Sequence, residues 1–229
     1  MGILSNKDTS DGEDLVNDFH FPTSKRALLI FTRNPELGRC KTRLAKVIGD
    51  ENALAVYNIL LQHTVNVTRN VSADRFVYYS ENIRENDIWD ATLFRKKIQH
   101  GGDLGERMEN AFTEILESGY QEVIIIGSDM YDLTTSDVEN AFLSMQHHDV
   151  VIGPAIDGGY YLLGMKRIIK NVFKNKKWGT NTVLGHTLED LKDQNTHKLP
   201  QKNDIDVFED LQNIDVFQPY LNRIKNTTA

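Results

Sequence analysis

Basic side chains cluster where the first apolar run of the sequence gives way to a predicted helix. Arg39, Lys41 and Arg43 lie within five residues of one another, after a predicted strand over 26–31. Free backbone N–H groups at a helix start attract anions, whereas basic side chains there oppose the helix dipole, so the cluster favours a phosphate site over a solvated helix start. A Walker A loop is excluded because Cys40 stands where that pattern requires the glycine before its lysine.

Carboxylates follow two later segments of the chain. Asp129 comes directly after the most apolar run, 122–127, where a charge is unfavourable unless it is solvated, hydrogen-bonded or coordinated to a cation. Asp204 and Asp206 would share one face of an extended segment and offer the hard oxygen ligands that suit Mg²⁺ or Mn²⁺. Two alternatives stay open: Asp129 caps the next turn, and the later pair is solvated or caps the last helix.

A third carboxylate lies in a predicted turn between two strands. The sequence Asp157-Gly158-Gly159 is first of all a turn signal, because glycine adopts positive φ angles freely. Tyr160 and Tyr161 follow it at the start of the next strand. Adjacent strand residues point to opposite faces, so one tyrosine can line a pocket while the other packs in the core.

Strand and helix patterns alternate along the chain and must position these side chains. The predicted strands cover 26–31, 75–80, 98–99, 122–127, 149–154, 160–165 and 197–199. The predicted helices cover 42–71, 104–118, 136–146, 182–191 and 207–213. Such alternation predicts an α/β fold with a mostly parallel central sheet and helices on both faces, in which ligands bind at the carboxyl ends of the strands.

Composition limits the class of protein. The chain has 229 residues, 40% of them hydrophobic, which suits one large domain. Its apolar runs are far shorter than the roughly 20 residues of a membrane-spanning helix, so we predict no membrane association. The single cysteine excludes an intramolecular disulfide framework and any cysteine-cluster metal site, and it fits a cytoplasmic protein.

The acidic residues are concentrated at the start of the chain. Residues 1–24 carry one lysine against five acids, which is more than half of the net charge of −7. We predict that residues 1–24 form a flexible acidic extension and that residues 25–229 form a single domain. The remaining body is nearly neutral, which gives no electrostatic case for nucleic-acid binding.

Five motifs in order resemble the bacterial DUF2064 family. They are KTRLA at 41–45, GGDLGERM at 101–108, GSD at 127–129, DGGYYLLG at 157–164 and DID at 204–206. The resemblance covers about residues 26–215. That family is described as a glycosyltransferase-like group associated with radical SAM and arsenosugar gene neighbourhoods. It is related to the molybdenum-cofactor and phospholactate nucleotidyltransferases.

The resemblance implies the GT-A fold, which is that of nucleotide-diphospho-sugar transferases, with Mg²⁺ or Mn²⁺ held by Asp129 and Asp206. It also places Lys41 and Arg43 at the nucleotide phosphate loop, and Gly101 and Gly102 near the base or ribose. We expect Asp129 and Asp157 to be catalytic, with Asp157 orienting or deprotonating the acceptor hydroxyl. The expected acceptor-binding residues are Gly158, Gly159 and Tyr160. The expected nucleotide-binding residues are Thr32, Arg33, Arg39, Lys41, Arg43, Gly101, Gly102 and Ser128.

The chain departs from the family pattern at two loops. Tyr131 stands where the family often has proline, and Val207-Phe208 replaces a common Thr-Pro pair. A strict Asp-x-Asp motif is also absent after the 122–127 strand, which makes nucleotide binding a firmer expectation than sugar transfer.

These residues support three hypotheses. The first is a metal-dependent glycosyltransferase-like enzyme that moves a sugar from a nucleotide-sugar donor to a small-molecule acceptor. The second is a nucleotidyltransferase that acts on a phosphorylated small molecule and releases pyrophosphate, and the third is a non-catalytic nucleotide-binding module. Sugar transfer is favoured because the basic loop has only Gly38 between Asn34 and Arg43, which suits a diphosphate held by side chains better than a triphosphate held by backbone N–H groups. The oligomeric state is left without a prediction.

Overall fold

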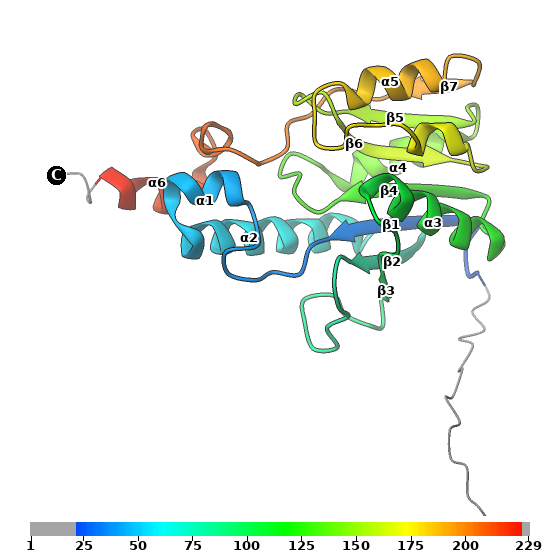
Figure 1. Cartoon of the computed structure of the whole chain (residues 1–229). Coiled ribbons are helices and arrows are strands. Elements are labelled where there is room, and N and C mark those ends of the chain that lie inside the picture. Colours follow the sequence, from blue (N-terminus) through cyan, green and yellow to red (C-terminus); the bar gives the residue numbers. More distant parts are fainter. Residues whose placement is uncertain (1–21, 226–229) are drawn as a thin grey trace, which may run out of the picture.

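Seven strands form one sheet in the computed structural model of the protein, which describes residues 22–225 (Figure 1). They are β1 (Arg26–Thr32), β2 (Asp74–Tyr79), β3 (Arg95–Ile98), β4 (Glu122–Gly127), β5 (Val150–Pro154), β6 (Tyr160–Met165) and β7 (Thr196–Lys198). Their order across the sheet is β3-β2-β1-β4-β6-β5-β7. Strand β6 runs antiparallel to β4 and β5, whereas the other neighbouring pairs are parallel. The predicted α/β fold with a mostly parallel sheet is confirmed.

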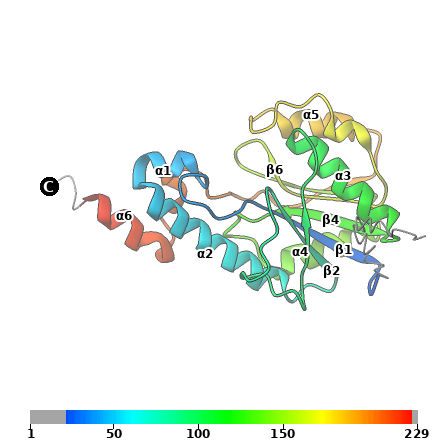
Figure 2. The same ribbon diagram turned by 60° about the horizontal axis from the view of Figure 1, so that its bottom comes forward.

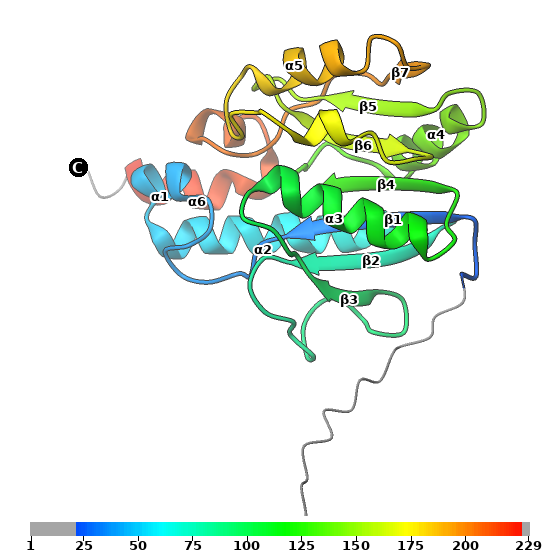
Figure 3. The ribbon, with the colours of Figure 1, turned by 45° about the vertical axis from the view of Figure 1, so that its right-hand side comes forward.

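Helices cover both faces of this sheet (Figure 3). They are α1 (Thr42–Ile48), α2 (Asp50–Thr68), α3 (Leu104–Glu117), α4 (Thr135–Met145), α5 (Val183–Asp190) and α6 (Gln218–Lys225). One core packs α1, α2, α4 and α6 against one face, and a second core packs α3 and α5 against the other. Strands β1 and β4 are apolar without alternation because both of their faces are buried, as the continuous runs predict.

The predicted helix over 42–71 is wrong, because two helices stand in its place. Gly49 separates them. Its φ of 82° and ψ of 158° form a backbone conformation that residues with a Cβ rarely adopt. Helix α1 therefore ends at Ile48 and α2 begins at Asp50. Helix α1 follows the basic loop directly, and the long α2 packs against one face of the sheet.

The predicted helix over 207–213 is also wrong. A single 3₁₀ turn, Phe208–Leu211, stands there, because the Asp210 carboxylate accepts hydrogen bonds from the backbone N–H groups of Asp206 and Val207 and tightens the segment. A second 3₁₀ turn, Asp215–Phe217, leads into α6, which the sequence reading did not predict. Helix α6 lies beside α1 and α2 (Figure 2).

The sheet brings several strand ends to one edge. The carboxyl ends of β1, β2, β4 and β5 lie there together with the amino end of the antiparallel β6. The loops that follow these strands carry the predicted site residues. The extension predicted over 1–24 lies mostly outside the described residues and stays a prediction. No helix among residues 22–225 is long and apolar enough to cross a membrane.

Candidate active site

A polar cleft of about 770 Å³ runs along the carboxyl ends of β1 and β4. Seven of the eight predicted nucleotide-binding residues line it: Thr32, Arg33, Arg39, Lys41, Arg43, Gly102 and Ser128. Gly101 does not line the cleft. It has φ 143° and packs so closely on α3 that a Cβ would lie 2.7 Å from the Arg107 backbone nitrogen, so it shapes the turn before that helix.

Lys41 is held inside the cleft by its backbone. Its φ of 49° and ψ of 48° place it in the left-handed region, which is unusual for a residue with a long side chain. The side chain is only 7% exposed, and its Nζ donates a hydrogen bond to Asp129 Oδ2 at 2.9 Å. Burial alone would lower the pKa of Lys41, but the carboxylates of Asp129 and Asp206 outweigh burial and raise it. A strained residue with a buried positive charge at a cleft is a candidate functional residue.

The same ammonium lies between two carboxylates. Lys41 Nζ is 3.9 Å from Asp206 Oδ1, and Arg43 Nη1 is 2.9 Å from Asp206 Oδ2. The Ile205 backbone N–H donates to the Asp129 carbonyl oxygen at 3.2 Å, which brings the 204–206 segment alongside the end of β4. The structure thus brings together the two residues predicted to share a metal ion.

Negative charge exceeds positive charge at the meeting point of these segments. Burial would raise the pKa of Asp129, but Lys41 outweighs it and holds that pKa below its usual value, so Asp129 is ionised. Burial, together with repulsion from Asp129 and Asp157, raises the pKa of Asp204 to about 6. The sequence reading treated Asp204 only as a partner of Asp206, whereas the structure places it directly among the other carboxylates.

The donor set fits a divalent ion that arrives with a nucleotide. Within residues 22–225, no group of three or more acidic, histidine or cysteine side chains is arranged to hold an ion unaided. Mg²⁺ is commonly bound by one or two carboxylates together with substrate phosphates, and Asp129 and Asp206 supply two carboxylates that already share a cation.

Hydroxyl groups form the floor of the cleft. Thr32 and Ser128 are almost fully buried and bond to each other, and both approach the Tyr57 hydroxyl from α2 at 3.2–3.3 Å. The Tyr57 hydroxyl also accepts a hydrogen bond from the Arg33 backbone N–H at 3.0 Å. The hydroxyls of Thr32 and Ser128 therefore join β1 and β4 to α2. Tyr57 was missed because it lies in the middle of a helix, far from any strand end in the sequence.

Arg39 lies at the rim of the cleft, and one further basic residue that lines the cleft was not predicted. The exposed guanidinium of Arg39 pairs with Glu36 and Glu81 at the rim. Arg107, on the first turn of α3, lines the cleft and donates to the carbonyl oxygen of Gly101 at 3.1 Å. Because Arg107 lies inside a helix in the sequence, its place in the cleft was not predicted.

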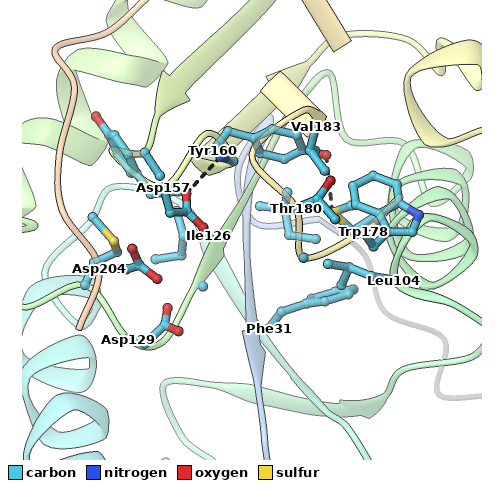
Figure 4. Close-up of a pocket in the computed structure, with 18 residues that line it drawn as sticks. Phe31, Leu104, Ile126, Asp129, Asp157, Tyr160, Trp178, Thr180, Val183 and Asp204 are labelled. Carbon is cyan, nitrogen blue, oxygen red and sulfur yellow. Dashed lines mark hydrogen bonds between the residues drawn. The ribbon is translucent and has the colours of Figure 1, made fainter. Parts of the chain in front are cut away.

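A second cavity, of about 240 Å³, opens from the same carboxylates (Figure 4). Asp129, Asp157 and Asp204 lie along one side of it, and the rings of Phe31 and Trp178 lie on the other. The remaining lining is largely apolar and includes Leu104, Met108, Ile125, Ile126, Met130, Tyr160 and Val183.

The predicted acceptor residues fall into two groups. Gly159 and Tyr160 line this second cavity, whereas Gly158 supports it from outside: a Cβ at Gly158 would lie 2.4 Å from the Asn181 carbonyl oxygen. Asp157 Oδ1 accepts the Gly159 backbone N–H at 2.8 Å, as the turn signal predicts. Tyr160 and Tyr161 point to opposite faces of β6, and the Tyr161 hydroxyl donates to the Pro200 carbonyl oxygen at 3.1 Å.

Solved structures share this architecture. A candidate nucleotide-diphospho-sugar transferase from Desulfovibrio desulfuricans G20 is 29% identical, with a TM-score of 0.77 over 89% of this chain and 96% of that one. The CMP:2-keto-3-deoxy-manno-octonic acid synthetase complexed with CTP is 13% identical, with a TM-score of 0.53 over 87% of this chain and 100% of that one. The manganese complex of Rv0371c from Mycobacterium tuberculosis H37Rv is 10% identical, with a TM-score of 0.52 over 82% of this chain and 96% of that one.

These comparisons confirm the predicted nucleotide-diphospho-sugar transferase fold. No curated protein sequence shows a significant match to the chain. The sequence profile of the family described as an uncharacterized protein conserved in bacteria matches residues 63–180, slightly more than half of the 229 residues. The chain therefore belongs to the DUF2064 family.

Proposed function

We propose that this protein is a metal-dependent transferase that moves a sugar from a nucleotide-sugar donor to a small-molecule acceptor. The observation that carries the proposal is the meeting of two unlike cavities at one group of carboxylates. The polar cleft with its basic loop and the largely apolar cavity share Asp129, Asp157 and Asp204 among their lining residues. Two ligands bound side by side would have their reacting groups at that point.

The polar cleft suits the donor. Lys41 and Arg43 lie at the start of α1, where they would bind the diphosphate, and Arg107 and Gly102 line the region assigned to the nucleoside. Asp129 and Asp206 would hold Mg²⁺ or Mn²⁺, which when bound neutralises charge on the leaving diphosphate. The manganese complex of the Mycobacterium tuberculosis relative supports such an ion in this fold.

Asp157 suits the acceptor side of the reaction. One of its oxygens is held by the Gly159 N–H, which fixes the carboxylate at the mouth of the second cavity. From there Asp157 would orient the acceptor hydroxyl and take its proton. Gly159 and Tyr160 would bind the rest of the acceptor.

Nucleotidyl transfer is the second candidate, because the fold is shared with a CTP-bound synthetase. Sugar transfer has more support: the most similar of the structures described above is a candidate sugar transferase, and the basic loop offers few backbone N–H groups to a triphosphate. A non-catalytic nucleotide-binding module is the third.

The leaving group separates these three functions. The protein would be incubated with Mn²⁺, a mixture of nucleotide sugars and nucleoside triphosphates, and a metabolite extract as the acceptor source. We expect acceptor-dependent release of nucleoside diphosphate, which the Asp157→Asn variant should slow by about 100-fold. Release of pyrophosphate without nucleoside diphosphate would establish nucleotidyl transfer, and release of neither would establish a binding module.

A further inference from the structure

The second cavity is lined mainly by apolar and acidic side chains. The described residues that line it include no lysine, arginine or histidine. Its walls come from Phe31 on β1, Met108 on α3, Tyr160 on β6 and Trp178 in the loop before α5. All three acidic side chains lie together at one end of the cavity (Figure 4).

This arrangement makes binding of a phosphorylated ligand unfavourable. A phosphate monoester placed in the cavity would lose its hydration and meet the carboxylates of Asp157 and Asp204 without a cationic partner from the lining. The ammonium of Lys41 lines the polar cleft instead, where it is bonded to Asp129. An uncharged hydroxyl meets no such penalty, because a carboxylate accepts its hydrogen bond.

We infer that the second cavity binds an uncharged acceptor, an inference that rests on the transferase function proposed above. The apolar or aromatic body of the acceptor would pack on Trp178, and its hydroxyl would face Asp157. A phosphorylated acceptor is excluded from the cavity. Trp178 thereby becomes a specificity-determining residue on the acceptor side, and the inference favours hydroxyl acceptors over the phosphate acceptors that the nucleotidyl alternative requires.

The size of the cavity agrees with one substituted ring. An apolar cavity of about 150 Å³ is large enough for benzene, and this one has about 240 Å³. The extra volume leaves room for a short substituent that reaches from the ring to the carboxylates.

Close packing holds Trp178 in place. A Cβ at Gly105 on α3 would lie 2.6 Å from Trp178 Cζ2 and 2.3 Å from the Phe173 carbonyl oxygen. Lys176, in the same loop, has a side chain that is 2% exposed and is paired with Asp190 at the end of α5. The indole is therefore part of a preformed wall, which lowers the entropic cost of binding a ring against it.

The test compares two probes that differ in charge. Saturation-transfer NMR would measure binding of 2-phenylethanol and of 2-phenylethyl phosphate to the full chain, without donor or metal. We expect the alcohol to bind, Trp178→Ala to weaken it by about tenfold, and Trp178→Phe to restore most of the affinity. Leu143→Ala, which removes a half-exposed apolar side chain on α4, serves as the matched control and should leave binding unchanged.

Two results would overturn the inference. One is an alcohol signal that is absent or that Trp178→Ala leaves unchanged, and the other is a phosphate signal that Trp178→Ala abolishes. The measurement is independent of catalysis. Alcohol binding without any sugar transfer would refute the proposed function alone, whereas sugar transfer without alcohol binding would refute the cavity assignment alone.

Discussion

The ammonium of Lys41 lies between two carboxylates that a divalent ion would also use. It is bonded to Asp129 and is 3.9 Å from Asp206. In the protein without nucleotide, the ammonium and the proposed ion would compete for these oxygens. The diphosphate of the proposed donor would offer the ammonium a different partner, so both cations could then be present together.

Removing the Lys41 ammonium should strengthen binding of the divalent ion. The Lys41→Met variant leaves Asp129 and Asp206 without their shared cation, so we expect it to bind Mn²⁺ alone about tenfold more tightly than the parent protein. Titration followed by the EPR signal of free Mn²⁺ gives the affinity. Lys192→Met, which removes an exposed ion pair with Glu189, is the control. Equal or weaker Mn²⁺ binding by Lys41→Met would show that the two cations use different oxygens.

Removing the charge of Asp129 should have the opposite effect. Asp129→Asn keeps the size of the side chain but takes away one carboxylate from the ion and the partner of Lys41. We expect nucleoside diphosphate binding in Mg²⁺ to weaken at least about tenfold, as measured by calorimetry. Asp193→Asn, the same change at an exposed position, should leave binding unaltered. Equal affinity of the parent protein in EDTA and in Mg²⁺ would refute metal dependence.

At the scale of elements, Gly49 sets the angle between α1 and α2. A Cβ at Gly49 would contact nothing within 4 Å, so Gly49→Ala tests the backbone conformation alone. Because φ is 82°, we expect a loss of about 1–3 kcal/mol in the free energy of unfolding, measured by urea denaturation. Gly185→Ala, inside α5 with equal space, should instead stabilise the protein by up to about 1 kcal/mol. An unchanged free energy of unfolding in Gly49→Ala would show that this backbone angle is unstrained.

Helix α4 begins with a capping box that should make stability depend on pH. Asp137 bonds to the N–H and hydroxyl of Thr134, and Lys202 pairs with it at 3.1 Å. Burial would raise the pKa of Asp137, but these hydrogen bonds outweigh it and lower the pKa. The charged form therefore stabilises the fold at neutral pH, and this contribution is lost as the pH falls through the lowered folded-state pKa.

We expect Asp137→Ala to lower the melting temperature by roughly 2–4 °C at pH 7, the effect of losing about 1 kcal/mol in a chain of this size. The difference from the parent protein should shrink steadily below about pH 4. Asp137→Asn keeps an acceptor oxygen without charge, so it should retain part of the stability but lose the pH dependence. If Asp137→Ala lowered the melting temperature equally at pH 3 and pH 7, the charge of Asp137 would not contribute to the helix cap.

The sequence predicted the strands of this fold better than its helix ends. Strands β1 and β4 were evident because a strand buried on both faces must be apolar throughout. The break at Gly49 could not be predicted, since a single glycine is tolerated inside a helix and only the tertiary packing of α1 requires the positive φ. The turn at Phe208–Leu211 was mistaken for a helix because its polar and apolar spacing is the same over one turn.

At the scale of the whole molecule, the sheet topology brings distant residues to one edge. The antiparallel β6 starts where the parallel strands end, so its first residues join the loops after β1 and β4. Site residues that directly follow strands, such as Asp129, were therefore predictable. Tyr57, Arg107 and Trp178 were not, because their roles come from the packing of helices and a loop against that edge.

In the proposed reaction, the two cavities hold a sugar donor and its acceptor on either side of the carboxylates. The most direct measurement is the mass of the acceptor product formed with Mn²⁺ from nucleotide sugars that carry ¹³C in the sugar and ¹⁵N in the base, together with ¹⁵N-labelled nucleoside triphosphates. We expect a product that gains the ¹³C label alone and that is not formed by the Asp129→Asn variant. A product that carries the ¹⁵N label would contradict it, because the base would then have been transferred with its phosphate.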